Sequence, residues 1–375
     1  MRMLLGALAL AASIVHSTTR AGQVQTLYTS PAHQIIAAFA QDGGLVAWFT
    51  PGVKSCNRAW VWELGSAQQH LPAQGPGYHN VTCDWQIPRG SPVGLAVAEN
   101  GGSPALLWTL HESAAQSLRF DYVLGATVHD PSERRFEEVA HAKHGAGLWL
   151  DGVAGGGTTL VYAVAQVAYK DQVGCLSTPK APGACDLQVV GGGIYRLVGR
   201  RPPVKVKGAK ASVAVAATGD EVAFVPAVGS STTDGHPLAS PFIPVEVRKA
   251  STGALVASIA PHGTPVAIAL SAGTLAILGR VNQTFVLSWY DMPSGKPAGS
   301  VPLPSTTAPA LSAGDGAIVF HVGRSIRWVD VTKQTVHTLA RAASAPIGLS
   351  IAGRRIAWAE NTDGHGRIRA ITLAG

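Results

Sequence analysis

Short apolar runs separated by turn residues fill residues 264–303, where the pattern of the whole chain is clearest. The four runs begin at Pro265, Thr274, Phe285 and Lys296. Gly, Pro and Asn residues lie in the turns between them. Strands this short, about 8–12 residues apart, are typical of an antiparallel β-meander. One such meander leaves a face uncovered, so the pattern predicts several of them packed together.

A second strand that ends in a large side chain recurs along the whole chain. Seven segments fit this description: Leu45–Trp48, Ala105–Trp108, Thr159–Tyr162, Glu221–Phe224, Thr274–Ile277, Ala317–Phe320 and Arg355–Trp358. They recur about every 40 to 60 residues, close to the length of a propeller blade. A proline followed by small apolar residues precedes several of them, and small side chains suit the crowded innermost strand of a blade. The two markers together predict seven repeated units.

The last of these units is one strand short. The units span residues 31–72, 92–141, 145–207, 211–260, 264–303, 308–341 and 346–374. Residues 23–30 form a strand that belongs to none of them. As the outer strand of the last unit they would close the ring and remove two exposed edges. The expected fold is all-β, a seven-bladed β-propeller domain over residues 22–375 with its last blade closed by the N-terminal strand.

With this organisation the sequence resembles the secreted bacterial propellers described as WD-repeat-like or TolB-like, over nearly all of residues 22–375. The Gly-His and Trp-Asp pairs of true WD repeats do not recur, and neither does the Asp-Pro plus Ser-Pro-Asp-Gly signature of TolB-type blades. A kelch-like turn, Gly191–Tyr195, occurs once. The resemblance therefore implies a fold and not one family.

Residues 1–21 have the features of an export signal. Arg2 precedes an apolar run from Leu4 to Val15, which is too short to span a bilayer, and small residues follow it. The even number of cysteines fits an oxidising compartment. We therefore expect a signal peptide at residues 1–21 and a mature protein that is secreted or lies in the periplasm or on the cell-envelope exterior. No transmembrane segment is expected after cleavage.

Composition and charge narrow the choice of partner only slightly. Hydrophobic residues make up 46% of the chain and charged residues 14%, with 43 Gly and 24 Pro, which suits buried strands joined by tight turns. The formal charge of +7 includes Arg2 and Arg20 of the leader, so the mature protein keeps a mild preference for acidic partners. Six basic residues between Arg196 and Lys210 are interpreted as protection of an outer strand edge. Nucleic acid is not an expected partner outside the cytoplasm.

The four cysteines, Cys56, Cys83, Cys175 and Cys185, are expected to form two disulfides. Cys175 and Cys185 lie within one insertion, while Cys56 and Cys83 belong to two insertions on one face of the ring. Other pairings would connect blade 1 to blade 3, although bridged Cα atoms must lie within about 7 Å. The expected bonds are therefore Cys56–Cys83 and Cys175–Cys185.

The candidate binding face carries the long insertions. In a propeller, the loops that join second to third strands lie on the same face as the loops that enter the next blade. Each expected insertion is one of these two kinds of loop: 51–58, 71–91, 169–186 and 229–244. Long loops on rigid scaffolds favour binding, although they also pack on themselves. Aromatic residues beside polar ones there suit peptide or carbohydrate recognition. The tentative binding residues are Tyr78, His79, Trp85, Tyr169, Lys170, Lys180, Asp234 and His236.

No motif for catalysis or a cofactor was found. His129, His141 and His144 lack the helical spacing that makes a zinc site informative, and no nucleophile elbow or phosphate loop occurs in a matching setting. We therefore expect no catalytic residues, no metal and no cofactor. The leading hypothesis is an exported, monomeric, non-catalytic propeller that binds a protein, peptide or envelope glycan. The alternatives are a lyase- or lactonase-type enzyme with His and carboxylate groups in the central channel, and a purely structural envelope component.

Overall fold

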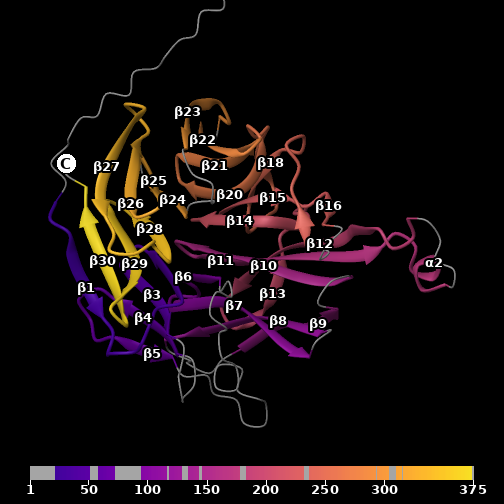
Figure 1. Ribbon diagram of the computed structural model, residues 1–375, viewed down its shortest axis with the longest axis horizontal. Helices are drawn as coiled ribbons and strands as arrows, with labels where there is room; N and C mark the ends of the chain where they lie inside the picture. Colours follow the sequence, from indigo (N-terminus) through magenta and orange to yellow (C-terminus); the bar gives the residue numbers. More distant parts are fainter. Residues whose placement is uncertain are drawn as a thin grey trace, which may run out of the picture.

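The computed structural model describes residues 22–50, 58–71, 94–115, 118–128, 134–142, 146–177, 183–231, 236–292, 294–303, 310–314 and 316–373. Seven four-stranded antiparallel sheets form the blades of a ring, each running from an inner to an outer strand (Figure 1). The predicted seven-bladed β-propeller is therefore confirmed. Each blade is an antiparallel meander, in which strands that follow one another along the chain are paired, apart from the two-stranded insertion of blade 4.

Blades 1 to 3 occupy the first half of the ring. Blade 1 contains β2 (Ala38–Asp42), β3 (Leu45–Thr50), β4 (Arg58–Glu63) and β5 (Gln69–Leu71). Blade 2 contains β6 (Leu95–Glu99), β7 (Pro104–Ala115), β8 (Leu118–Thr127) and β9 (Arg134–Ala142). Blade 3 contains β10 (Gly147–Gly156), β11 (Thr159–Tyr169), β12 (Leu187–Val198) and β13 (Arg201–Lys205).

Blades 4 to 7 complete the ring. Blade 4 contains β14 (Ser212–Thr218), β15 (Glu221–Pro226), β18 (Val245–Lys249) and β19 (Leu255–Ile259), with a two-stranded insertion of β16 (Gly229–Ser230) and β17 (Pro237–Leu238). Blade 5 contains β20 (Thr264–Ser271), β21 (Thr274–Val281), β22 (Thr284–Asp291) and β23 (Pro297–Leu303). Blade 6 contains β24 (Leu311–Gly314), β25 (Ala317–Val322), β26 (Ser325–Asp330) and β27 (Thr335–Arg341). Blade 7 contains β28 (Gly348–Ala352), β29 (Arg355–Thr362) and β30 (His365–Thr372).

The N-terminal strand β1 (Gln25–Thr29) is the fourth strand of blade 7. It pairs antiparallel with β30, with Gln25 opposite Ala370 and Thr29 opposite Arg367. The backbone N–H of Ser30 extends this pairing by donating to the carbonyl oxygen of Gly366 at 2.8 Å. The predicted closure by the N-terminal strand is therefore confirmed, and it covers the edge of β30 that would otherwise be open.

The large residue at the end of each second-strand motif fills the same place in every blade. Each lies opposite an apolar residue of the innermost strand: Trp48 opposite Phe39, Trp108 opposite Leu95, Tyr162 opposite Val153, Phe224 opposite Val215, Ile277 opposite Ile268, Phe320 opposite Leu311 and Trp358 opposite Leu349. All seven large side chains are buried. Burial of a side chain of this size stabilises the fold by about 1.5–3 kcal/mol, which explains why the pattern recurs.

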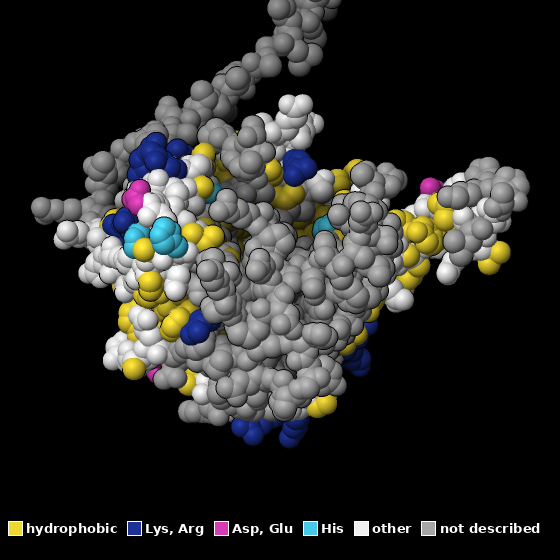
Figure 2. Space-filling model, turned by 60° about the horizontal axis from the view of Figure 1, so that its bottom comes forward, with side chains coloured by type: hydrophobic (Ala, Val, Ile, Leu, Met, Phe, Trp, Pro, Cys, Tyr) yellow, Lys and Arg dark blue, Asp and Glu magenta, His cyan; other side chains and the backbone are white. Residues whose placement is uncertain are grey.

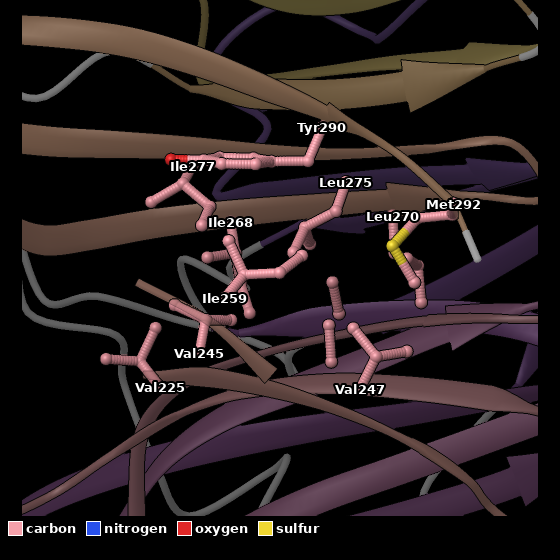
Figure 3. Close-up of a cluster of buried hydrophobic side chains, with 12 residues drawn as sticks. Val225, Val245, Val247, Ile259, Ile268, Leu270, Leu275, Ile277, Tyr290 and Met292 are labelled. Atoms are coloured by element: carbon pink, nitrogen blue, oxygen red, sulfur yellow. The ribbon is translucent and has the colours of Figure 1, made fainter. Parts of the chain in front are cut away.

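The hydrophobic core is divided into clusters that lie between neighbouring blades. Figure 3 shows the cluster between blades 4 and 5, where Val245 and Val247 of β18 face Ile268 and Leu275 of blade 5. Tyr290 lies on the same face, and its hydroxyl donates to the carbonyl oxygen of Ala260 at 3.3 Å. Successive sheets therefore pack face to face around the ring, and each blade depends on both of its neighbours.

Helix content is confined to one short element in the part of the chain that the structure describes. This helix, α2 (Gln172–Leu176), lies in the connection between β11 and β12. In the same described ranges, no helix has the length and apolar character needed to cross a membrane.

Candidate functional site

The seven innermost strands surround a central cavity of about 230 Å³. One small side chain from each blade lines it at equivalent positions: Ala40, Ala96, Ala154, Ala216, Ala269, Ser312 and Ser350. These residues are small because seven strands converge on the axis. Among the described residues that line the cavity, Asp42 has the only ionisable side chain.

Asp42 lies at the end of the cavity where first strands turn into second strands. Its Oδ2 accepts a hydrogen bond from the backbone N–H of Gly157 at 2.8 Å, which connects blade 1 to blade 3. Burial raises the pKa of Asp42, the bond from Gly157 opposes this rise, and the nearby charge of Glu99 adds to it, so the pKa lies above its usual range. A carboxylate held in this way supports the turn of blade 3.

Glycines make this turn possible. A Cβ added to Gly155 would lie 2.5 Å from the carbonyl oxygen of Val97, and one added to Gly156 would clash with the carbonyl oxygen of Ala217. The turn of blade 3 therefore fits between blades 2 and 4 only without side chains.

The opposite face of the ring carries the long connections. Chain direction places every connection from a second to a third strand, and from a fourth strand to the next blade, on this face. The three longest, 72–94, 170–186 and 227–244, all belong to blades 1 to 4, whereas the connection 51–57, within the expected insertion 51–58, is no longer than the connection 304–310 between blades 5 and 6. In blades 5 to 7 the second-to-third connections are tight turns, and Asn282 and Asp363 have positive φ there. One half of the ring therefore carries the insertions.

The connection of blade 3 forms a projecting arm, defined here as residues 166–190. In Figure 1 the arm extends well beyond the ring with α2 near its tip. Asp171 caps α2, since its Oδ1 accepts from the N–H of Gly174 at 3.0 Å. Cys175 and Cys185 form a disulfide with their Cα atoms 4.7 Å apart. The tip of the arm is thus held by a covalent bond and a helix cap.

The connection of blade 4 forms a second insertion, called here the hairpin and defined as residues 227–244. It begins with the N–H of Ala227 donating to the carbonyl oxygen of Ala211 at 2.8 Å, and the N–H of Val228 donates to Leu238 at 3.0 Å. The imidazole of His236 packs edge-on against the indole of Trp149, with ring centroids 5.2 Å apart. The hairpin is therefore folded back onto the inner strand of blade 3.

A small hydrophobic cluster joins the bases of the arm and the hairpin. It contains Trp149 of β10, Val167 of β11, Leu187 and Val189 of β12, and Ala227 at the start of the hairpin. Trp149 is almost completely buried in it. The two insertions are consequently fixed relative to each other where they leave the ring.

Exposed hydrophobic side chains are concentrated on the arm and the hairpin. Eight large hydrophobic residues are exposed in the described ranges, and five of them lie on the arm or the hairpin: Val173, Val190, Val228, Leu238 and Phe242. Phe242 is 89% exposed and Val173 is 81% exposed. Figure 2 shows hydrophobic side chains along the part that projects from the ring. Exposed apolar groups gathered in this way mark interaction surfaces.

Three of the tentative binding residues can be placed. Tyr169 and Lys170 lie in the arm, where the N–H of Lys170 donates to the carbonyl oxygen of Asp186 at 2.7 Å. His236 lies in the hairpin against Trp149. The structure thus carries all three on neighbouring insertions. Five others, Tyr78, His79, Trp85, Lys180 and Asp234, fall outside the described residues, as do Cys56 and Cys83.

The exposed apolar residues of the arm and hairpin were not found by sequence reasoning. Val173, Val228 and Phe242 look like ordinary core residues in the sequence, and their exposure depends on how far the insertions project. Proximity to proline and serine, as in Ser240-Pro241-Phe242, is the one sequence signal that could have placed Phe242 in a turn.

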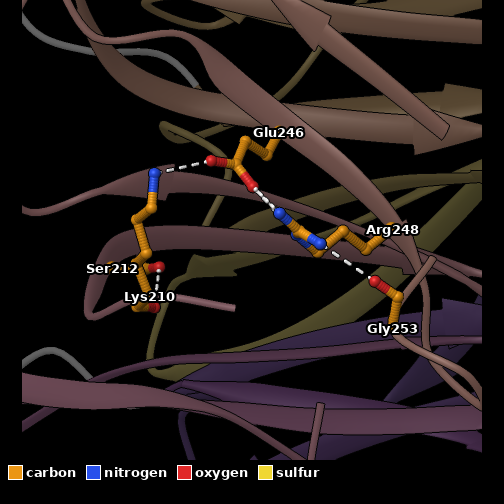
Figure 4. A network of polar contacts seen from close by, with 5 residues as sticks. All are labelled: Lys210, Ser212, Glu246, Arg248 and Gly253. Carbon is orange, nitrogen blue, oxygen red and sulfur yellow. Dashed lines mark hydrogen bonds and ion pairs between the residues drawn. The ribbon is translucent and has the colours of Figure 1, made fainter. Parts of the chain in front are cut away.

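The basic segment from Arg196 to Lys210 covers the end of β12, the outer strand β13 and the connection to blade 4. Figure 4 shows that Lys210 binds Glu246 of β18 at 2.8 Å and that Arg248 binds the other carboxylate oxygen of Glu246. Although burial raises the pKa of Glu246, the hydrogen bonds from Lys210 and Arg248 outweigh it and lower the pKa. Lys210, in the connection between blades 3 and 4, therefore forms an ion pair with blade 4.

Comparison with known proteins supports the fold. No protein-family model matches the chain, and no curated protein sequence matches it. An oligogalacturonate lyase in complex with manganese is similar in structure, with a TM-score of 0.54, 11% identity and 96% of each chain covered. The uncharacterized protein lmo1340 from Listeria monocytogenes EGD-e gives a TM-score of 0.42 at 8% identity over 92% of each chain. TolB from Acinetobacter baumannii gives 0.38 at 11% identity, covering 72% of this chain and 55% of that chain.

At these identities the likeness concerns the fold alone. The match to the lyase structure and the ring of seven blades agree with each other. The fold of this chain is that of a seven-bladed β-propeller.

Proposed function

We propose that this chain is an exported, non-catalytic propeller that binds a protein or peptide through the surface formed by the arm and the hairpin. The observation that carries the proposal is the gathering of exposed Val173, Val190, Val228, Leu238 and Phe242 on two insertions that share a base. A rigid scaffold that holds apolar groups in water gains free energy when a partner covers them.

The chemistry of the exposed groups favours a protein over a glycan. The side chains are aliphatic apart from Phe242, whereas sugar rings are usually held by exposed aromatic faces beside polar groups. In the described ranges, the indoles of Trp48, Trp108, Trp149, Trp289 and Trp358 are buried instead. An envelope glycan is therefore the second choice of partner.

The proposal also includes export of the chain from the cytoplasm. This part rests on the signal-like residues 1–21 and on the disulfide between Cys175 and Cys185, which persists only where conditions are oxidising. The mature chain would then act as a monomer outside the cytoplasm, in the periplasm or on the exterior of the envelope.

An enzyme acting in the central cavity is the alternative, since a propeller of similar fold is a lyase. Such an enzyme requires several His or carboxylate groups that converge on its substrate. Among the described residues that line the cavity, only Asp42 is ionisable, and its carboxylate already accepts a hydrogen bond from Gly157. We therefore favour binding.

Photo-crosslinking from single positions tests the proposal. A benzophenone amino acid is placed at Phe242 or at Val173, and as a matched control at Leu255, which is 54% exposed on the outer strand of blade 4. Incubation with envelope extract should give a discrete protein adduct from the first two positions and not from Leu255. Equal labelling at all three positions, or adducts that are glycan and contain no protein, would overturn the proposal.

A further inference from the structure

The outer edge of β12 is only partly covered. β12 has 12 residues, but its outer neighbour β13 has 5 and pairs with it only between Tyr195 and Val198. One more bond follows, from the N–H of Val206 to the carbonyl oxygen of Ile194 at 2.8 Å. Beyond Ile194 no described strand pairs with this edge. The stretch Leu187–Gly192, called here the open edge, runs into the arm without a strand hydrogen-bonded to its outer side in the described ranges. Strand β16 of the hairpin approaches β12 but pairs only with β17.

A side chain takes the place of a strand at the inner end of the open edge. Lys205 donates from Nζ to the carbonyl oxygen of Gly192 at 2.6 Å. The carbonyl of Gly192 therefore points outward, where the next strand of the sheet would lie. A backbone N–H of a partner could replace the exposed ammonium group of Lys205 on this carbonyl at a small cost in free energy, because the released ammonium group would be solvated by water.

The open edge lacks the residues that usually protect a strand edge. Its sequence Leu-Gln-Val-Val-Gly-Gly contains no charge and no proline, whereas β13 contains Pro202, Pro203 and Lys205. Pairing with β11 shifts by one residue at Val190, and the side chain of Val190 is half exposed. Unprotected edges with exposed apolar side chains are sites of strand addition.

Positive charge lies beside the inner end of the open edge. Lys205 at the end of β13 and Lys207 two residues after it are both exposed there. No ion pair involving these two side chains is present in the described part of the chain. A peptide bound along the open edge would therefore bind more tightly if acidic residues at one of its ends lay beside these basic side chains.

We propose that the open edge binds an extended peptide segment of a partner protein as an additional strand, with acidic residues of that segment against Lys205 and Lys207. Main-chain hydrogen bonds supply affinity in such an arrangement, and side chains and charge supply selection. A peptide antiparallel to β12 runs in the same direction as β13, so its N-terminal end lies at Lys205. The acidic residues must then precede the apolar ones in the peptide.

This inference rests on the proposed function in one respect, that the partner is a protein. The arm and hairpin surface could bind a folded protein without strand addition, so the two proposals fail separately. Crosslinking from Phe242 tests the surface, and the peptide experiment below tests the edge.

The probe is a fluorescein-labelled peptide, Asp-Glu-Asp-Gly-Val-Thr-Val-Thr-Val, titrated with the mature protein in fluorescence anisotropy. Its control has the same residues in reverse order. We expect the peptide with the acidic residues first to bind about tenfold more tightly than the reversed one. Backbone N-methylation of alternate residues should abolish binding for one of the two possible sets of positions, since it removes the N–H groups that pair with the edge.

Two pairs of variants locate the site. Val190→Lys should weaken binding about tenfold by adding a charge to the edge, while Leu255→Lys, on the outer strand of blade 4, should leave it unchanged. Lys205→Glu should weaken binding by a similar factor and reverse the preference for the acid-first peptide, whereas Lys296→Glu in blade 5 should have no effect. Circular dichroism verifies that all four variants are folded.

Several outcomes would overturn the inference. These are the absence of binding up to about 1 mM, equal binding of the N-methylated peptides, and no effect of Val190→Lys. Sedimentation of the protein alone gives a further test: a dimer that forms with rising concentration and is lost in Val190→Lys would assign the open edge to a second copy of the chain instead. Crosslinked adducts from Phe242 together with a failed peptide experiment would leave the proposed function standing without strand addition.

Discussion

Nε of Arg355 in blade 7 donates to Oε1 of Gln41 in blade 1 at 3.2 Å. Nε2 of Gln41 in turn donates to the carbonyl oxygens of Ser350 and Arg355, each at 2.9 Å. Gln41 is buried, and burial lowers the pKa of Arg355. The seam between the last and first blades is thus held near the axis by side chains, in addition to β1 at the rim.

Replacing Gln41 should weaken this seam. Gln41→Leu leaves one guanidinium donor and two carbonyl oxygens without their partner, which should lower the free energy of unfolding by about 2–4 kcal/mol. Urea unfolding measures the loss. Gln172→Leu, on the exposed surface of α2, serves as the control and should change stability by less than about 0.5 kcal/mol. A similar small change in both variants would contradict the role given to Gln41.

Removal of the N-terminal strand should open the ring. A mature protein that lacks residues 22–30 exposes the edge of β30 and loses the contacts of Leu27 and Tyr28 with the cluster between blades 7 and 1. We expect a lower melting temperature and aggregation through the new edge. Light scattering and thermal denaturation check this. A monomeric deletion variant with an unchanged melting temperature would show that closure by β1 is dispensable.

The ion pairs of Glu246 should make stability depend on pH. Its pKa in the folded protein lies below the ordinary value of 4.5, so its contribution is complete above that pH and is lost as the pH falls through the lower, folded value. At pH 7, Glu246→Gln should lower the free energy of unfolding by about 1.5–3 kcal/mol, and the difference from the unsubstituted protein should shrink in acid.

The control for this prediction is Glu221→Gln. Glu221 pairs with Lys249 at 2.8 Å, whereas Glu246 also binds Arg248, whose side chain is only 18% exposed, so the loss for Glu221→Gln should stay below about 1 kcal/mol. Guanidinium unfolding at pH 7 and pH 3 provides both comparisons. A difference between Glu246→Gln and the unsubstituted protein that is the same at the two pH values would refute the assignment.

The disulfide of the arm should stabilise the arm and not the ring. Replacing Cys175 and Cys185 with Ser should leave the melting temperature nearly unchanged, because the arm lies outside the blade interfaces. Limited proteolysis should become faster within residues 170–186, since a bond of this kind contributes about 2–4 kcal/mol locally. A large fall in melting temperature would show that the arm is coupled to the ring.

Peptide mapping under non-reducing conditions tests the second expected bond, Cys56–Cys83. Cleavage of the exported protein should yield one peptide pair that contains these two residues and another that contains Cys175 and Cys185. Free thiols at Cys56 and Cys83 would argue against the oxidising compartment and the shared face. A crossed pairing would contradict the Cys175–Cys185 bond as well.

The blades could be predicted because their sequence pattern has a direct physical cause. Each large residue such as Trp108 or Phe224 must fill the space beside the inner strand, so it recurs at one position of the repeat. The turn at Asp363 and Gly364 could also be predicted from the sequence, since both residues adopt the positive φ angles that an Asp-Gly pair favours. These features could be predicted because each depends on residues that are close together in the sequence.

The candidate site could be predicted only in outline. The insertions were visible as long connections, but the exposure of Val173 and Phe242 and the contact of His236 with Trp149 depend on how each insertion folds against its neighbours. The bond between Asp42 and Gly157 joins residues that are 115 positions apart, and no pattern near either residue signals it. Long-range packing decides such features, and a single sequence does not display it.

Closure by β1 also sets the order in which the protein can be completed. Ser30 and Gly366, which hydrogen-bond beside this closure, are separated by 336 residues, so the first strand of the propeller to be synthesised is among the last to find its partner. Until the last blade has been synthesised, blade 1 has one face uncovered. A polypeptide that ends prematurely keeps two bare flanks and can be recognised by proteases and chaperones, so the ring itself distinguishes finished chains from unfinished ones.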